Sequence, residues 1–347
     1  MFVIQNTNAD PFTGSFTFLG AVSDSSNTSS IDGTVLQHPS GQLYFIWSGA
    51  PDAPGGIQNL YIAKMSNPWT ISSQRILISA PTYSWETQGL PINEGPEIII
   101  RNNTISLVYS ASGSWTNYYC LGLLTASTSS DPMNPASWTK RSTPIFQSGN
   151  NIIAPGHNSF TKSPDGTEDW IVYHTARYNN SGWTRQVRTQ KFTWNADSTP
   201  NLGTPVPPNI PIQIPSGEQV RTRYEFENAV LLNGPTAIND STASSNVKVG
   251  NFLYSNSSAI LTIQCATAGD YILALRSANG TPGGANANFL VSINNASTTM
   301  YATVYSGWDN WGANVIRVTL NQGINTLTFT LSSNSFELDA VDVFPYI

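Results

Sequence analysis

A chain of 347 residues is long enough to form two domains of ordinary size, each with its own hydrophobic core. Charged residues make up only 10% of the chain and its net charge is −6, so it lacks the excess of Lys and Arg that a nucleic-acid surface needs. Aromatic residues make up 11%, and Ser, Thr, Asn and Gln dominate the polar positions, a composition that favours uncharged, hydroxyl-rich partners such as glycans.

The N-terminal residues, MFVIQNTNADP, are strand-like and contain no signal peptide. We therefore expect the chain to start inside a longer protein. Since no apolar run approaches the roughly 20 residues that span a bilayer, we expect no membrane association. Cys120 and Cys265 fall in different predicted domains, so a disulfide between them is not expected.

The first 205 residues contain short apolar or alternating runs between clusters of Gly, Pro, Asn and Asp, with no helical periodicity. The clearest runs are 34–38, 42–47, 59–65, 97–101, 105–111, 119–125, 169–175 and 185–194. They predict β-strands, so the expected fold class is all-β.

Three stretches beginning at residues 31, 93 and 154 repeat one pattern: a Gly-containing turn, a strand, a polar hairpin loop and a second strand. Each is followed by a segment with a Pro, an aromatic residue next to Thr and a short apolar strand, which indicates four strands per unit, as in a propeller blade. Within the repeat Asp32, Glu94 and His157 are predicted to share one register, spaced by 62 and then 63 residues.

The first strand of every propeller blade lines the central channel, so these three side chains are expected to converge on one axial cavity. FVIQN and SFTFLG, before residue 31, match only the outer two strands of an earlier blade. The sequence thus predicts three blades and part of a fourth.

The Pro-rich stretch 206–221 ends the periodicity and is predicted to be a linker between residues 1–205 and a second domain, 222–347. The second domain has alternating strands with hairpin-type turns, which predict a β-sandwich of the jelly-roll kind.

The turns IDGTV and NEGPEI, the stretch YSASGSWTNYYCLGLL and the turn APGHNSF resemble glycoside hydrolase family 43 and, within it, the α-L-arabinofuranosidases. The resemblance covers residues 1 to about 200 and implies a five-bladed propeller. It implies that Glu94 is the general acid and Asp32 the carboxylate that orients it and tunes its pKa. It further implies that His157 binds an axial Ca²⁺ or the water around it.

The resemblance also suggests sugar contacts. Arg188 lies in a segment similar to the family's Arg-containing strand, and Trp47, Trp115 and Tyr118 could offer aromatic faces to a sugar ring. Simpler roles stay open: Glu94 could accept hydrogen bonds from turn amides, and His157 could be structural.

The family's general base is an aspartate at the start of the first blade, and no residue here matches it. Asp10 has the wrong phase relative to Asp32. The resemblance therefore implies an N-terminally truncated member that lacks the first blade and the inner half of the second, and that is inactive alone.

Residues 222–347 resemble carbohydrate-binding modules of families 35 and 6, through YEFENAVLLNG, SNVKVGNF, GDYILALRSANG, GWDNW and LDAVDVF. In such modules acidic residues of the first and last strands hold a structural Ca²⁺, and Glu225, Glu227 and Asp339 fit those places, although they could equally be solvated. Ligand contacts are expected from Trp308, Trp311 and Asn279, with a core position as the alternative for Trp311.

These features together predict a secreted, monomeric, inverting glycosidase for arabinan or arabinoxylan, with an appended sugar-binding module. The alternatives are a β-xylosidase or exo-galactanase of the same family, and a non-catalytic glycan-binding protein.

Overall fold

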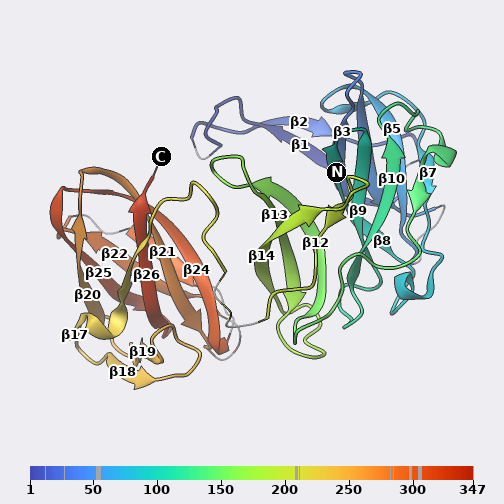
Figure 1. Ribbon diagram of the computed structural model, residues 1–347. Helices are drawn as coiled ribbons and strands as arrows, with labels where there is room; N and C mark the ends of the chain where they lie inside the picture. The colour runs from blue at the N-terminus through green and yellow to red at the C-terminus, as the bar shows by residue number, and fades with distance from the viewer. Residues whose placement is uncertain are drawn as a thin grey trace. The chain divides into compact units, whose positions relative to one another are not determined.

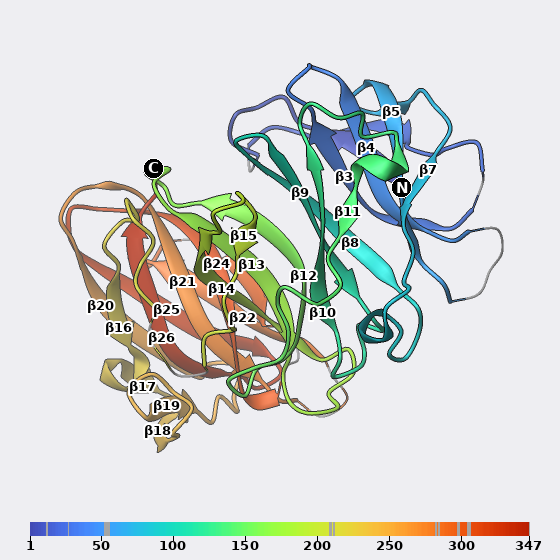
Figure 2. The same ribbon diagram turned by 45° about the vertical axis from the view of Figure 1, so that its right-hand side comes forward.

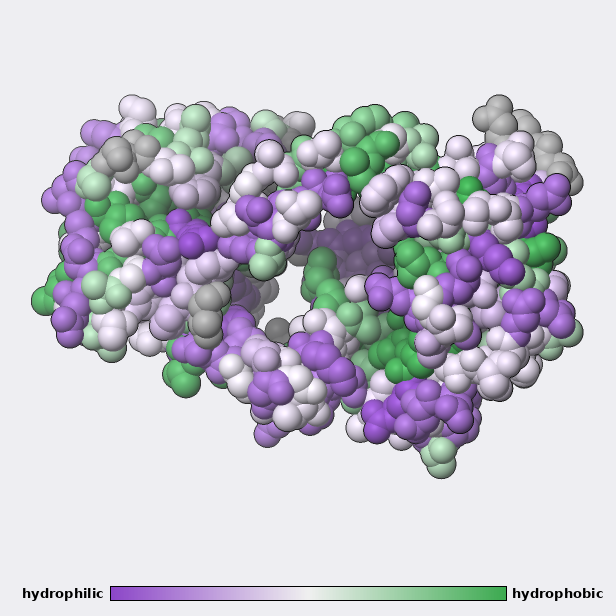
Figure 3. All heavy atoms as spheres, turned by 90° about the horizontal axis from the view of Figure 1, so that it is seen from above, coloured by the Kyte–Doolittle hydropathy of each residue, from purple (hydrophilic) through white to green (hydrophobic). Residues whose placement is uncertain are grey.

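The structure, a computed structural model, describes residues 1–11, 13–26, 28–51, 56–207, 210, 212–281, 283, 285–296, 299–303 and 307–346, with the backbone alone for residues 309 and 310. Its regular structure is almost entirely β-strand, which confirms the predicted fold class. The chain forms two compact units, Met1–Glu218 and Gln219–Ile347 (Figure 1). The face drawn in Figure 3 is a mixture of hydrophilic and weakly polar residues with smaller apolar areas, as the composition leads one to expect.

Among its described residues, the first unit contains four antiparallel sheets. A two-stranded sheet is formed by β1 (Phe2–Gln5) and β2 (Thr17–Ala21). The next sheet contains β3 (Ser30–Gln37), β4 (Leu43–Gly49), β5 (Asn59–Asn67), β6 (Thr70–Ile71) and β7 (Ile76–Ser79), with β6 and β7 both paired to β5. The third contains β8 (Asn93–Arg101), β9 (Thr104–Ala111), β10 (Cys120–Ser127) and β11 (Thr139–Lys140). The fourth contains β12 (Ile153–Lys162), β13 (Asp169–Ala176), β14 (Arg185–Trp194) and β15 (Pro200–Asn201).

Successive strands within each of these sheets are neighbours, except that β6 and β7 both pair with β5. The short 3₁₀ helices η1 (Ser84–Glu86) and η2 (Pro135–Ser137) lie in the connections before β8 and β11. The first strands of the three larger sheets, β3, β8 and β12, pack side by side with β8 in the middle (Figure 2). This is the arrangement expected of consecutive blades.

Hydrophobic cores lie between neighbouring sheets. Ile46 and Ile62 pack against Leu107 in one core, and Val108, on the other face of β9, packs against Ile171 in the next. Because both faces of β9 are covered, nearly all of its residues are buried, including the small polar residues Ser106 and Ser110.

The second unit is a sandwich of two antiparallel sheets. One sheet contains β16 (Thr222–Glu225), β18 (Thr236–Asn239), β19 (Val247–Gly250), β21 (Gly269–Asn279), β24 (Gly307–Leu320) and β26 (Glu337–Pro345). The other contains β17 (Val230–Leu232), β20 (Ser258–Cys265), β22 (Ala287–Ile293), β23 (Thr299–Thr303) and β25 (Gly323–Ser333), and η3 (Phe226–Asn228) follows β16. Inward-facing residues of both sheets, such as Phe289, Phe329 and Leu273, form its core.

The boundary between the units, after Glu218, falls inside the Pro-rich stretch 206–221. Part of this stretch is attached to the first unit. The Ser216 hydroxyl donates to Asp165 Oδ2 at 2.5 Å, and the Ser216 amide donates to Glu168 Oε2 at 3.0 Å. The stretch is therefore not a free spacer along its whole length.

Candidate functional site

Each of the three inner strands carries a β-bulge at the same place. The pairing register shifts between Ile31 and Thr34 in β3, between Glu94 and Glu97 in β8, and between Gly156 and Ser159 in β12. The residue that opens each bulge has a left-handed backbone, with φ of 56° at Asp32, 53° at Gly95 and 50° at His157.

This register corrects one detail of the sequence analysis. Asp32 and His157 are equivalent, but their counterpart in β8 is Gly95, and Glu94 lies one residue earlier, directly before the bulge. Successive residues of a strand point to opposite sides, so a one-residue difference changes where a side chain points. The bulges re-aim the side chains here, a common use of bulges near functional sites.

The left-handed residues are held by contacts between strands. Asp32 Oδ2 accepts the Gly95 amide at 3.1 Å, and the His157 amide donates to Ser110 Oγ at 2.7 Å. A side chain on Gly95 would meet the His157 ring at 3.2 Å. Glycine suits this position, because it adopts a positive φ without strain and leaves room for the close approach of the imidazole.

The predicted convergence of Asp32, Glu94 and His157 is confirmed by their contacts. The Tyr119 hydroxyl donates to Glu94 Oε1 at 2.5 Å and lies 3.4 Å from His157 Nδ1, and His157 Nε2 lies 4.0 Å from Asp32 Oδ1. An adjoining cavity of about 100 Å³ is lined by Asp32, Gly33, Gly95, Pro96, Glu97, His157 and Asn158. The three blade-like sheets therefore bring residues about sixty positions apart to one place.

Glu94 has a raised pKa. Its side chain is only 8% exposed, and burial is the main cause of the rise. The negative charge of Asp32 adds to it, while the Tyr119 hydrogen bond and the positive charges of His157 and Arg185 act in the opposite direction. A raised pKa favours the protonated form of a carboxyl group, which is the form that can donate a proton.

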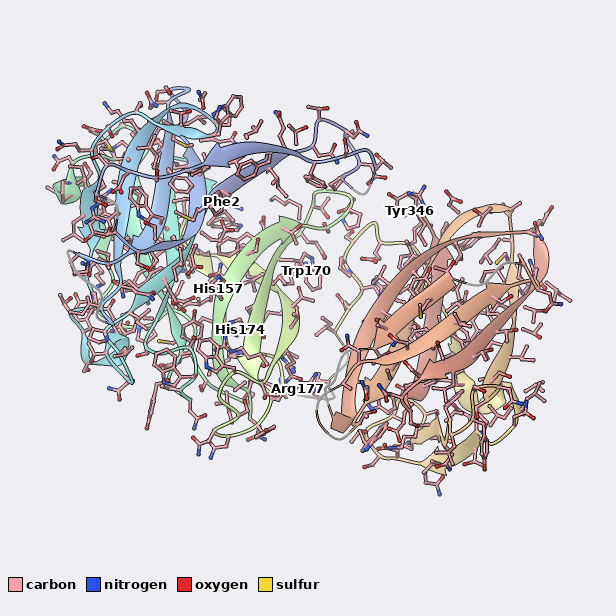
Figure 4. The ribbon with its side chains drawn as sticks, turned by 180° about the vertical axis from the view of Figure 1, so that it is seen from behind. Phe2, His157, Trp170, His174, Arg177 and Tyr346 are labelled. Atoms are coloured by element: carbon pink, nitrogen blue, oxygen red, sulfur yellow. The ribbon has the colours of Figure 1, made fainter. Side chains whose placement is uncertain are left out.

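Sequence reasoning missed two residues, His174 and Arg185, that complete this environment. His174 stacks on Tyr119, with ring centroids 5.5 Å apart and planes at 3°, and its ring lies 6.1 Å from that of His157 (Figure 4). Burial and the nearby positive charges of Arg185 and His157 lower the pKa of His174 to about 4, so it is neutral at pH 7. Its Nε2 then accepts a hydrogen bond from Arg185 Nη1 at 3.0 Å.

The position of Arg185 could have been found from its strand. Arg185 is the first residue of β14 and lies three residues before the predicted sugar contact Arg188 in the same strand. Arg188 instead donates to the Val206 carbonyl at 2.9 Å, within the stretch that leaves the last sheet. The structure therefore places Arg185, rather than Arg188, beside Glu94.

Glu97 and Asn158 were also missed, although both line the axial cavity. The Thr34 hydroxyl donates to Glu97 Oε2 at 3.3 Å, and burial raises the pKa of Glu97. Asn158 is only 4% exposed, and neither its Oδ1 nor its Nδ2 has a hydrogen-bond partner among the described residues. Both residues lie within the quoted turns NEGPEI and APGHNSF, but the sequence alone does not show that they line the cavity, because this depends on the bulge register.

The connection that leads into β8 is fixed by a buried carboxylate, Glu86. It accepts hydrogen bonds from the Thr82 and Tyr83 amides, both at 2.8 Å, and from Asn93 Nδ2 at 2.9 Å. Lys140 Nζ forms an ion pair with it at 2.6 Å. Since Asn93 directly precedes Glu94, this network positions the strand end that carries Glu94.

The predicted aromatic contacts have different outcomes. Trp47 is only 1% exposed and lies in the core with Phe45 and Tyr61, so the prediction that it contacts sugar is wrong. Its strand, β4, is the second of its sheet and has both faces covered. Trp115 is half-buried, with its ring centroid 5.7 Å from that of the exposed Trp183, and Tyr118 is 64% exposed. These two positions are open to a ligand.

In the second unit, the prediction that Asn279 contacts sugar is wrong. Asn279 is fully buried, and its amide donates to the Ala285 and Thr303 carbonyls, so it organises the loop after β21. Trp308 is half-buried and packs closely over Gly280. Trp311, also half-buried, donates from Nε1 to Thr242 Oγ1 at 3.0 Å.

The predicted calcium ligands of this unit lie near one another. Ser244 Oγ donates to Glu225 Oε2 at 2.6 Å and to Asp339 Oδ1 at 3.2 Å, and the Ser245 hydroxyl donates to Glu227. Asp339 is also paired with Arg276 Nε at 2.8 Å. Burial raises the pKa of Glu225, and the charges of Asp339 and Glu227 add to the effect.

Within the part of the chain that the structure describes, no three His, Cys, Asp or Glu side chains are grouped closely enough to hold a metal ion, at these residues or at His157. Cys120 and Cys265 are both buried free thiols. None of the described helices is long and apolar enough to cross a membrane.

Comparison with known proteins identifies relatives of the first unit. The sequence profile of glycosyl hydrolases family 43 matches residues 1–200. An extracellular exo-α-(1→5)-L-arabinofuranosidase of Streptomyces avermitilis is 44% identical over 214 residues, which are 59% of this chain and 44% of that protein. The α-L-arabinofuranosidase 43 of Humicola insolens is 42% identical over 215 residues, with the same shares. The chain thus spans less than half the length of these curated relatives.

Two solved structures are also similar. The α-L-arabinofuranosidase of Lactobacillus brevis has a TM-score of 0.57 and 38% identity, over 60% of this chain and 67% of that one. The exo-β-1,3-galactanase of Phanerochaete chrysosporium covers 95% of this chain and 72% of its own, with a TM-score of 0.51 and 18% identity. The second likeness shows a shared fold alone.

Proposed function

The chain belongs to glycosyl hydrolases family 43, and from this premise we propose that it acts on arabinose-containing plant polysaccharides as an inverting, α-L-arabinofuranosidase-like glycosidase. The observation that carries the proposal is the buried Glu94 carboxyl, whose pKa is raised beside Asp32 at a point where three inner strands meet. The relatives that are 38–44% identical to this chain are all named as arabinofuranosidases, which supports arabinose as the sugar released.

Inverting hydrolysis needs one carboxylic acid that protonates the leaving oxygen and one carboxylate that activates water on the opposite face of the sugar. Glu94 is the acid in this proposal. The Tyr119 hydroxyl donates to Glu94 Oε1, so the proton that Glu94 transfers is held on its other oxygen, Oε2. Asp32 keeps the pKa of Glu94 high and, through the Gly95 amide, fixes the backbone next to it. The general base is assigned to no residue of this chain.

The test is release of arabinose from an arabino-oligosaccharide by this chain and by Glu94→Gln, followed by chromatography. Each is assayed with and without formate, a small carboxylate that can stand in for a base. We expect Glu94→Gln to lower the rate by about 10²–10⁴-fold. Release that requires formate would mean that the base is not supplied by this chain.

Two alternatives give different results in the same experiment. A β-xylosidase or an exo-galactanase would release xylose or galactose from the matching oligosaccharides and little arabinose. A non-catalytic glycan-binding protein would bind oligosaccharide with unchanged affinity in the Glu94→Gln variant and would release no sugar under any of these conditions. The second result would overturn the proposal.

The remaining assignments are part of the same proposal. The second unit is a carbohydrate-binding module that uses Trp308 and Trp311, and the protein acts outside the cell as a monomer. Calcium sites are proposed at His157 and at Glu225, Glu227 and Asp339. In the second unit the unpartnered Glu227 Oε2 and the three carboxylates suit Ca²⁺, but ligation requires these side chains to move closer together.

A further inference from the structure

A second cavity, of about 260 Å³, lies beside the site and has no assigned role. Its walls come from three connections: the η1 region with Trp85 and Gln88, the segment 117–120 before β10, and the loop between β11 and β12 with Gln147. We propose that this cavity is a separate binding site for one uncharged sugar unit of a glycan. The choice of ligand class rests on the proposed function.

The chemistry of the walls favours a neutral, amphipathic ligand. No Lys, Arg, His, Asp or Glu lines the cavity, so nothing there would recognise an ionic group. Tyr118, 64% exposed, supplies an open aromatic ring against which the apolar face of a sugar can pack. The side-chain amides of Gln88 and Gln147 supply donors and acceptors for hydroxyl groups.

The walls are fixed before any ligand binds. Trp85 Nε1 donates to the Ser142 carbonyl at 2.9 Å, and its ring stacks on Tyr83 at 6.0 Å with planes at 11°. Asn117 Nδ2 donates to Asn179 Oδ1 at 2.6 Å, which ties the segment before β10 to the next sheet. A site held in this way loses little conformational entropy when it binds a small ligand.

The cavity and the candidate catalytic site share one wall. Tyr119 lines the cavity, and its hydroxyl is the group that donates to Glu94 Oε1 at 2.5 Å. Tyr119 is therefore common to the cavity and the candidate catalytic site, which places the cavity near Glu94. The site can hold a polysaccharide close to Glu94 without taking part in bond cleavage.

The test is a titration of the whole chain, labelled with ¹⁵N, with α-1,5-arabinotriose, observed at the indole N–H of Trp85. This signal is assigned by its loss in Trp85→Phe and reports the cavity separately from any sugar site in the second unit. We expect the Trp85 signal to shift on titration. Tyr118→Ala should raise the fitted Kd by roughly five- to tenfold, whereas Tyr118→Phe should retain binding because it keeps the aromatic ring.

The matched control is Tyr254→Ala, which removes an equally exposed tyrosine, 61% against 64%, from the second unit and should leave this Kd unchanged. The proposal is overturned if saturating arabinotriose leaves the Trp85 signal in place, or if Tyr118→Ala binds within twofold of the parent. Both outcomes are independent of hydrolysis. If no arabinose is released in the activity test but the Trp85 signal still shifts, the proposed glycosidase activity is rejected and the proposed cavity site is retained.

Discussion

At the scale of single residues, the chemistry depends on a pair of carboxyl groups in unequal surroundings. Glu94 is buried and hydrogen-bonded to Tyr119, whereas Asp32 is less enclosed and holds the Gly95 amide. Burial disfavours the charged form of Glu94, and the nearby negative charge of Asp32 disfavours it further. The difference between their environments favours the protonated form of Glu94, as the proposed role of proton donor requires.

Replacing Asp32 by Asn should lower the pKa of Glu94. The substitution removes a negative charge that disfavours ionisation but keeps an oxygen that can accept the Gly95 amide. Without that charge the ionised form of Glu94 is less disfavoured, so its pKa falls toward the ordinary value. The pKa of Glu94 can be measured by a pH titration of the ¹³C signal of its carboxyl group, whether or not this chain is catalytically active.

The exposed Asp131 gives a control for general effects of charge removal, since Asp131→Asn should leave the Glu94 titration unchanged. An unchanged or higher Glu94 pKa in Asp32→Asn would show that the charge of Asp32 does not act on the acid.

At the scale of secondary-structure elements, the site depends on the ends of strands. The repeated bulges in β3, β8 and β12 aim residues into the cavity, and the connection before β8 is fixed by Glu86. Glu86 is fully buried, and its partners are backbone amides, Asn93, Tyr109 and Lys140. A charge buried in this way is stable only while it is fully paired.

Lys140→Met should therefore destabilise the first unit strongly. It leaves the buried Glu86 carboxylate without its cation, a change that costs about 3–5 kcal/mol in comparable buried pairs. The free energy of unfolding is measured by urea titration, followed by the fluorescence of the tryptophans.

Lys191→Met is the matched control. It breaks the pair between Lys191 and Glu168, whose lysine is half exposed, and should cost less than about 1 kcal/mol. Equal losses in the two variants would mean that the Glu86 network does not hold the β8 connection.

At the scale of the whole molecule, the two units have separate cores. The sandwich encloses its own cluster around Phe289 and Phe329, and the first unit has its cores between successive sheets. Each unit thus has the buried apolar surface that independent folding requires.

We expect residues 219–347 to fold when expressed alone and to give one cooperative thermal transition in calorimetry, with an additional transition for the whole chain. If the proposed calcium site exists, Ca²⁺ should raise the Tm of the isolated unit and EDTA should lower it, because a ligand that binds only the folded state stabilises it. A broad, non-cooperative transition would contradict independent folding, and an unchanged Tm would reject calcium binding in this unit.

The sequence by itself was enough to predict the β-class and the meeting of Asp32, Glu94 and His157. These features follow from periodicity and turn chemistry, which are local properties of the chain. The sequence placed Glu94 in the same register as Asp32 and His157, which is wrong by one residue. Bulges change the spacing between equivalent residues without leaving a sequence signal of their own.

Only the tertiary structure decided which side chains face the site. Trp47 is in the core because neighbouring sheets cover both faces of β4, Asn279 is buried by loop contacts, and Arg185 lies beside Glu94 while Arg188 does not. Tyr119 and His174 join the site through contacts between two sheets. Burial and proximity between distant segments are properties of the packed fold, and a pattern of residue types along one strand does not contain them.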